Sequence, residues 1–236
     1  TEAEAQSAKG ARQFLIGTYA ALKGTGWEGG GSNWVYGSIS GGDANKGSDA
    51  GDQADIVPIQ QFSHTPTNNY FNLKWRALYE GIARANSTIR ILSKLTDKEI
   101  SNAEKTSILA QARFLRGYYH FEAKKMWNKI PFVDETINTT NAKVPNSADW
   151  TKIMDDLNFA RQNLLAVQDA VGKVNKWAAD AYYAKALLFQ QKYTEALPIL
   201  TNIITNGVTS KGIPYALAPT FHSLFNADSE NIAAVR

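Results

Sequence analysis

The chain has 236 residues, of which 44% are hydrophobic and 20% charged, and its net charge is +3. This length and composition are typical of a globular protein with one large domain or two small ones. The 25 basic residues nearly balance 22 acidic ones without forming a basic cluster, which argues against nucleic-acid binding. The chain has no cysteine, which excludes disulfides and thiolate metal sites, and no apolar run long enough to span a bilayer.

The first predicted element is a helix over residues 4–22. Its apolar residues recur every three or four positions, the spacing that places side chains on one helical face. They are Ala8, Ala11, Leu15, Tyr19 and Leu22. Gly24 and Gly26 are expected to end this helix, because glycine suits the backbone conformations that follow a helical C-terminus.

Residues 24–69 are predicted to form an irregular segment, because Gly, Ser, Asp and Asn dominate there and the helical spacing disappears. A long irregular segment inside a compact domain is uncommon and often functional. Trp27, Trp34 and Tyr36 stand in it among small residues. Flat aromatic faces suit sugar rings, so these three are candidate ligand contacts. The alternative is that the rings fold back on the helices and anchor the loop.

The end of this segment, HTPTNNY at residues 64–70, mixes amide, hydroxyl and aromatic groups. Asn68, Asn69 and Tyr70 are further candidate ligand contacts. The alternative is structural, with Asn68 or Asn69 capping the helix that follows.

Asp43, Asn45, Gly47, Asp49 and Asp52 form D-x-N-x-G-x-D-x2-D, a spacing faintly similar to that of calcium loops. The pattern lacks flanking helices and a bidentate Glu at its last position. A turn-rich loop held by Asx side chains is therefore the favoured interpretation. No metal and no other cofactor is predicted.

Residues 71–127 are predicted to form two consecutive helices at the centre of the core. The first stripe of apolar residues comprises Trp75, Leu78, Tyr79, Ile82, Ala85, Ile89 and Leu92. The second comprises Ile108, Ala112, Leu115, Tyr119, Ala123 and Met126, beside a neighbouring face of Phe114, Tyr118 and Phe121. Helices apolar over so wide an arc must be buried on more than one side.

Helices of tetratricopeptide type are predicted over residues 149–207, after a polar connection at residues 134–149. The expected helices cover residues 149–167, 176–191 and 194–206, and residues 214–225 can hold a further short one. Packing positions of such a helix pair are matched by Ala184, Leu187, Tyr193, Ala196 and Leu200. The match is partial, since Asp180 stands where that pattern often has Trp.

No catalytic constellation is recognisable, so the chain is not expected to be an enzyme. The three histidines, His64, His120 and His222, show no ligand spacing, and His120 is expected in the core. Arg113 and Arg116 are expected to pair with carboxylates. No nucleophile triad, phosphate loop or glycosidase carboxylate pair stands out.

Two segments carry a resemblance to a known family. The pattern W-x3-Y-x2-I-x-R-A-N at residues 75–86 resembles the SusD/RagB family. So does A-R-F-L-R-x-Y-Y-x-F at residues 112–121, followed by K-I-P-F at residues 129–132. Two long signatures in the right order are much more specific than one short motif.

The resemblance implies an all-α SusD-like fold, with tetratricopeptide-type helix pairs and a long irregular loop insertion. It implies a surface lipoprotein of the Gram-negative outer membrane that captures oligosaccharide or polysaccharide for a TonB-dependent SusC-like transporter. Membrane attachment would come only from a lipid anchor upstream of this chain. SusD-like chains normally continue further, so residues 1–236 are expected to be one domain truncated at its C-terminus. The alternative function is a helical-repeat scaffold for protein interaction, without a small-molecule ligand of its own.

Overall fold

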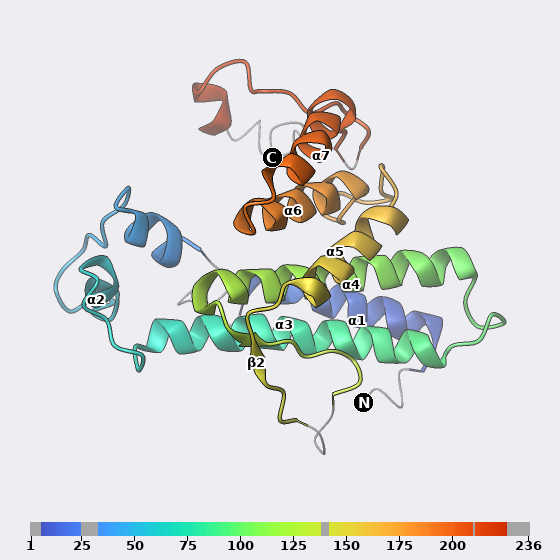
Figure 1. Cartoon of the computed structure of the whole chain (residues 1–236), viewed down its shortest axis with the longest axis horizontal. Coiled ribbons are helices and arrows are strands. Elements are labelled where there is room, and N and C mark those ends of the chain that lie inside the picture. The colour runs from blue at the N-terminus through green and yellow to red at the C-terminus, as the bar shows by residue number, and fades with distance from the viewer. Residues whose placement is uncertain (1–5, 25–32, 138–141, 210, 226–236) are drawn as a thin grey trace.

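The computed structural model describes residues 6–24, 33–137, 142–209 and 211–225, and nearly all regular structure in them is helical (Figure 1). The prediction of an all-α fold is therefore confirmed. None of the helices in these ranges combines the length and apolar character needed to cross a bilayer.

The elements follow one another along the chain with two short strands among the helices. They are α1 (Ala8–Ala20), the 3-10 turn η1 (Ala21–Lys23), the π-helical turn η2 (Val35–Ile39), α2 (Ile56–Gln60), α3 (Asn69–Lys94), α4 (Asn102–Trp127), β1 (Ile130–Pro131), β2 (Asn146–Ser147), α5 (Thr151–Asn163), α6 (Lys176–Phe189), α7 (Tyr193–Asn206) and the 3-10 turn η3 (His222–Phe225).

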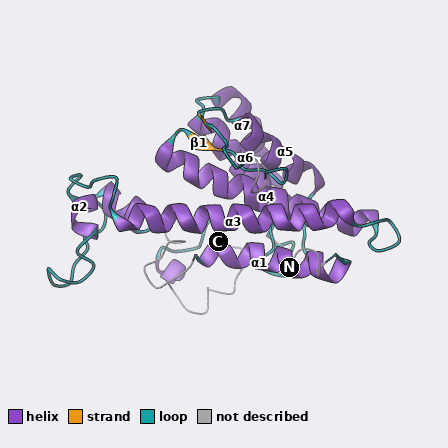
Figure 2. Cartoon of the chain, turned by 90° about the horizontal axis from the view of Figure 1, so that it is seen from below, coloured by secondary structure: helices purple, strands orange, loops and turns teal. Residues whose placement is uncertain are grey.

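The centre of the molecule is the long pair α3 and α4, each of 26 residues. Figure 2 shows α1 on one side of α3, and α4 to α7 on the other. Both predicted apolar stripes are buried here, apart from three partly exposed side chains at the ends of the pair. Those three are Trp75, Tyr79 and Met126. Trp75 stacks on Tyr79 at 4.3 Å between ring centroids and meets Trp127 edge-on at 5.0 Å, so these rings serve packing.

A glycine allows α3 and α4 to come close together. The ring of Tyr119 lies against Gly81, where an added Cβ would come within 2.5 Å of it. The Tyr119 hydroxyl continues past α3 and donates to the carbonyl oxygen of Thr18 in α1, at 2.7 Å. One side chain thereby joins three helices, which requires that residue 81 has no side chain.

Arg116 holds α3, α4 and α5 together by polar contacts inside the core. Its guanidinium donates to both carboxylate oxygens of Asp156, at 2.7 and 2.8 Å, and to Oδ1 of Asn86 at 2.9 Å. It also pairs with Glu135, and Arg113 donates to the same Asp156 at 2.7 Å. The expected pairing of both arginines with carboxylates is confirmed. Because Asp156 is 1% exposed, these contacts are what make its burial tolerable.

Helix boundaries differ from the prediction where a side-chain cap or an extended residue ends the periodic pattern. The first helix begins at Ala8, because Ser7 is extended and its hydroxyl accepts from the amide of Gly10. The helix predicted to run to residue 167 stops at Asn163, since Leu164 is extended with ψ 143°. The connection at residues 134–149 was not expected to contain a strand, yet it holds β2, which pairs antiparallel with the preceding β1 so that Ser147 lies opposite Ile130.

The helix pair α6 and α7 packs much as predicted, around Ala184, Leu187 and Ala196. Leu200 packs against this cluster from its edge. The expectation for Tyr193 was wrong, because its side chain is 62% exposed. Tyr193 is the first residue of α7, so its ring lies beyond the interface that Ala196 enters three residues later.

Candidate ligand-binding site

The segment between α1 and α3 has a small core of its own. It sits at the N-terminal end of α3, away from the main helix layers (Figure 1). Its two short turns, η2 and α2, bury Val35, Ile39, Ile56 and Ile59 against Tyr70. The segment predicted to be irregular therefore contains local helices, which present its polar residues on a fixed base.

Tyr36 and Lys74 form the base beneath η2. The Tyr36 hydroxyl donates to the carbonyl oxygen of Tyr70, and the ring of Tyr36 lies 6.2 Å from that of Phe71. Lys74 is 2% exposed, and its ammonium donates to Oδ1 of Asn33 at 2.8 Å and lies 5.5 Å from the Tyr36 ring. Burial lowers the pKa of Lys74 to about 8 and raises that of Tyr36. Tyr36 thus anchors the loop to α3, which was the alternative to its being a ligand contact.

Asn68 caps α3, as the structural alternative predicted. Its Oδ1 accepts from the amide of Tyr70 at 3.0 Å, and its Nδ2 donates to the carbonyl oxygen of Asp55 at 2.8 Å. Tyr70 is 5% exposed and donates its hydroxyl to Gln53, so its ring faces the small core. Asn69 is exposed as the first residue of α3. The structure thus brings Tyr36, Asn68 and Tyr70 together as a support.

Two aromatic side chains of this segment face solvent. Trp34 is 43% exposed and directly precedes η2, whereas Trp27 lies outside the described residues. Phe62, which the sequence analysis missed, is 73% exposed and borders a hollow of about 430 Å³. The hollow also carries the polar side chains of Ser40, Asp43, Asn45 and Gln60. Phe62 could have been found in the sequence, because it is an aromatic residue in a polar run, as Trp34 is.

The Asp-rich loop is held by its own side chains and by a lysine. Asn45 Oδ1 accepts from the amide of Gly47, and Asp49 Oδ1 accepts from the amides of Gly51 and Asp52. The ammonium of Lys46 donates to the carbonyl oxygens of Asp49 and Asp52. These contacts are those of the Asx-held loop that was favoured over a calcium site. Across the described ranges, no cluster of three His, Asp or Glu side chains is arranged to hold a metal.

His120 is a core residue, as predicted. It is fully buried, and burial lowers its pKa to about 3. Its ring stacks on Phe132 at 4.1 Å, and Nε2 accepts from the amide of Val133 at 3.1 Å. The other ring nitrogen faces the carbonyl oxygen of Arg116 at 3.0 Å and therefore carries the proton. Both ring nitrogens of His120 have partners inside the core, so neither is available to a ligand at the surface.

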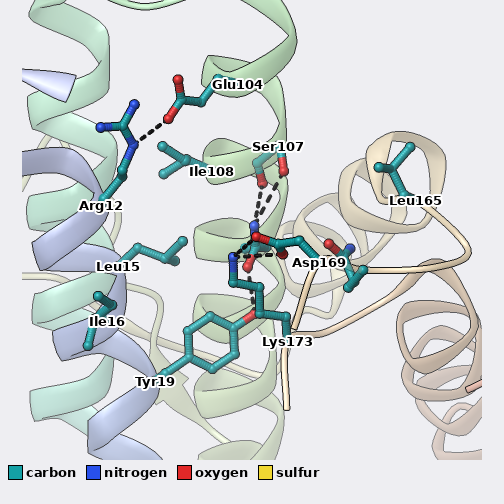
Figure 3. Close-up of a pocket in the computed structure, with 12 residues that line it drawn as sticks. Arg12, Leu15, Ile16, Tyr19, Glu104, Ser107, Ile108, Leu165, Asp169 and Lys173 are labelled. Carbon is teal, nitrogen blue, oxygen red and sulfur yellow. Dashed lines mark hydrogen bonds and ion pairs between the residues drawn. The ribbon is translucent and has the colours of Figure 1, made fainter. Parts of the chain in front are cut away.

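A separate cavity of about 410 Å³ lies between α1, α4 and residues 165–173 (Figure 3). Its polar groups already have partners: Arg12 pairs with Glu104, Lys173 with Asp169, and the Tyr19 hydroxyl donates to Gln111. None of the predicted ligand contacts that the structure describes lines this cavity. The candidate site therefore remains the segment over the start of α3.

The fold and this segment define an all-helical protein that carries exposed Trp34 and Phe62 on a loop insertion over a tetratricopeptide-type scaffold. A family model described as "Starch-binding associating with outer membrane" matches residues 36–188. The chain belongs to this SusD-like family, which confirms the resemblance carried by the two helix motifs.

Curated relatives agree with this assignment. SusD-like protein P25 of Formosa agariphila is 24% identical over 249 residues, covering 95% of this chain and 43% of that protein. A SusD-like protein of Bacteroides ovatus is 28% identical over 131 residues, covering 54% of this chain and 24% of that protein. The chain thus spans less than half the length of the curated relatives it matches.

Two solved structures share the fold at 22% identity. A laminarin-binding SusD-like protein superposes with a TM-score of 0.77, covering 94% of this chain and 49% of its own. Surface glycan-binding protein A from Bacteroides thetaiotaomicron, in complex with laminarihexaose, superposes with a TM-score of 0.75 and covers 94% and 47%. At this identity the likeness concerns the fold alone.

Proposed function

We propose that this chain belongs to a non-catalytic protein that binds an oligosaccharide or polysaccharide and delivers it to a TonB-dependent SusC-like transporter. The description of its family as starch-binding supports this proposal, as do the glycan-binding names of proteins that share its fold. The observation that carries it is the exposure of Trp34 and Phe62 on this segment, 43% and 73%.

The proposed mechanism is stacking of sugar rings on exposed aromatics, with polar side chains reading the hydroxyls. Trp34 and Phe62 supply the apolar faces, and the hollow beside Phe62 supplies Asp43, Asn45 and Gln60. Tyr36, Asn68 and Tyr70 act by holding the segment on α3, whereas exposed Asn69 can reach a ligand. Trp27 stays a proposed contact from the sequence alone.

Isothermal titration against laminarin, soluble starch, xylan and alginate tests the proposal. The parent chain should bind at least one of these, and Trp34→Ala should weaken that binding at least tenfold, because truncating a Trp that dominates a binding contact costs about 2 kcal/mol or more and tenfold corresponds to about 1.4 kcal/mol. Phe62→Ala should weaken the same binding to a lesser extent.

The matched control is Phe221→Ala, which removes an aromatic ring of similar exposure, 77%, from the C-terminal part of the described chain. It should leave binding unchanged. A parent chain that bound none of the four polysaccharides would overturn the proposed function. If Trp34→Ala and Phe62→Ala each bound that polysaccharide as tightly as the parent does, the proposed site would be overturned.

The cellular setting follows from the family description, which associates the family with the outer membrane. We propose a surface-exposed lipoprotein, anchored by a lipid outside this chain and seated on its transporter. Protease accessibility on intact cells, and co-purification with a TonB-dependent barrel, are the measurements. Degradation only after cell lysis would contradict surface exposure.

The scaffold alternative rests on α7, whose outer face carries apolar residues. Leu197 and Ile204 are 65% and 79% exposed. An exposed apolar stripe on a repeat-type helix is a usual protein-binding surface. Leu197→Ser with Ile204→Ser should leave glycan titrations unchanged, so a loss of transporter co-purification without a loss of glycan binding would separate the two functions.

A further inference from the structure

A second hollow, far from η2 and α2 in the sequence, lies between the start of α5 and the turn joining α6 to α7. Its volume is about 400 Å³. Two half-buried aromatic side chains line it, Trp150 and Tyr183. Its rim carries two carboxylates, an amide and an ammonium, from Asp149, Asp155, Gln190 and Lys192. None of these residues belongs to the segment at residues 33–70.

Both rings are fixed in place by cations that are themselves anchored. The ammonium of Lys124 lies 5.0 Å from the Trp150 ring and donates to the carbonyl oxygens of Asn128 and Ala148. The guanidinium of Arg161 lies 4.9 Å from the Tyr183 ring and pairs with Asp180. Rings held in this way lose little conformational freedom when a ligand stacks on them.

The rim groups are available for hydrogen bonds to a ligand. Asp155 and Lys192 are exposed, and in the described residues neither side chain has an ion pair or a hydrogen bond. Gln190 donates one side-chain amide hydrogen to the carbonyl oxygen of Ala186 at 3.0 Å. Asp149 accepts from Thr151 through Oδ1, which fixes its carboxylate at the start of α5.

Two exposed aromatics are next to rim residues in the sequence, and one of them, Phe189, meets Phe121 edge-on at 5.4 Å. Tyr193 directly follows Lys192 and is 62% exposed, and Phe189 directly precedes Gln190 and is 51% exposed. Tyr193 is the residue whose expected packing in the α6–α7 pair was not found.

We propose that this hollow is a second saccharide subsite, which binds one or two units of a neutral glycan chain. The inference rests on the proposed function, because it adds a second contact for the same polymer. Two carboxylates against one ammonium on the rim disfavour uronate residues, so the ligand class is a neutral hexose or pentose polymer. Two weak sites on one chain would raise retention on a polysaccharide more than either site alone.

The test compares polymer and hexasaccharide binding in four chains: the parent, Trp34→Ala, Asp155→Ala with Lys192→Ala, and Trp150→Leu. The probes are laminarin, soluble starch and xylan, each with its hexasaccharide, and alginate as the acidic comparison. The matched control is Asp97→Ala with Lys98→Ala, which removes the same pair of charges from the exposed α3–α4 connection. The Asp155 and Lys192 variant changes only exposed side chains, so it keeps the test valid if Trp150→Leu folds poorly.

The expected result is that both subsite variants bind a neutral polymer at least fivefold more weakly than the parent. They should also lose one of two binding events in hexasaccharide titrations, while Trp34→Ala loses the other. Subsite variants that matched the parent within twofold, while Trp34→Ala did not, would overturn this inference and leave the proposed function standing. Binding of alginate alone would also overturn it. A parent that bound none of the polysaccharides would overturn both.

Discussion

The α3–α4 pair and the segment at residues 33–68 differ in how they use similar residues. In the helix pair, aromatics and charges are turned inward, and each buried charge meets its partners, as Arg116 does with Asp156 and Asn86. In the segment, a core of five residues supports side chains that face outward, including Trp34 and Phe62. The helix pair therefore supplies most of the buried core, and the segment is where we propose that ligand recognition takes place.

The largest expected effect is on the helix pair, from Arg116→Met. The substitution leaves the Asp156 carboxylate buried with only Arg113 as a cationic partner, which should cost about 3–5 kcal/mol of unfolding free energy. Chemical denaturation measures it. Arg113→Met is the control, and its loss should be smaller because that side chain is 24% exposed. Equal losses would show that the three-helix contact is not centred on Arg116.

The close approach of α3 and α4 predicts the next largest loss of unfolding free energy. Gly81→Ala places a Cβ within 2.5 Å of the Tyr119 ring, and such overpacking typically costs about 1–3 kcal/mol. Gly17→Ala, in α1 with nothing within 4 Å, should instead stabilise the protein by about 0.5–1 kcal/mol. Opposite shifts in melting temperature for the two substitutions are the expected outcome, and a stable Gly81→Ala protein would contradict the packing described.

His120 predicts a pH dependence that also belongs to the helix pair. Its pKa falls from 6.5 to about 3 on folding, so between these values the unfolded chain binds the extra proton. Stability is full above pH 6.5 and falls as the pH drops, by at most about 1.4 kcal/mol per unit, or about 2 kcal/mol by pH 5. The measurement is the difference in unfolding free energy between parent and His120→Gln from pH 7 to 5. Parallel pH curves would rule out His120 as the source.

The smallest effect on global stability is expected from a substitution in the segment at residues 33–68. Ile39→Ala should change the global unfolding free energy by less than about 1 kcal/mol, because its five-residue core can open locally while the helices stay folded. Hydrogen exchange should accelerate at residues 35–44, and glycan binding should weaken with it. Ile91→Ala is the matched control in α3, where it should cost about 2–5 kcal/mol globally. Equal global losses would erase the distinction between the two regions.

The sequence predicted the helix pair well because its apolar spacing is decided locally and repeated over many turns. Pairing of Arg116 with a carboxylate was predictable, but its partners Asp156 and Glu135 were not, since they lie 40 and 19 residues away. The contact of Tyr36 with Tyr70 spans 34 residues and depends on how α2 folds back. Short turns such as η2 carry too few residues for a periodic signal, so the sequence showed which aromatics were unusual and left open which face solvent.

The network around Arg116 has a consequence for how such chains can diverge. Asn86 and Asp156 both accept hydrogen bonds from Arg116, so a substitution of Arg116 removes a buried partner from each of them. We expect these positions to change together or not at all among relatives. Trp34 and Phe62 face solvent, so we expect that a lineage can replace them one at a time. The chain can thus acquire a new ligand preference while its helices keep the same partners.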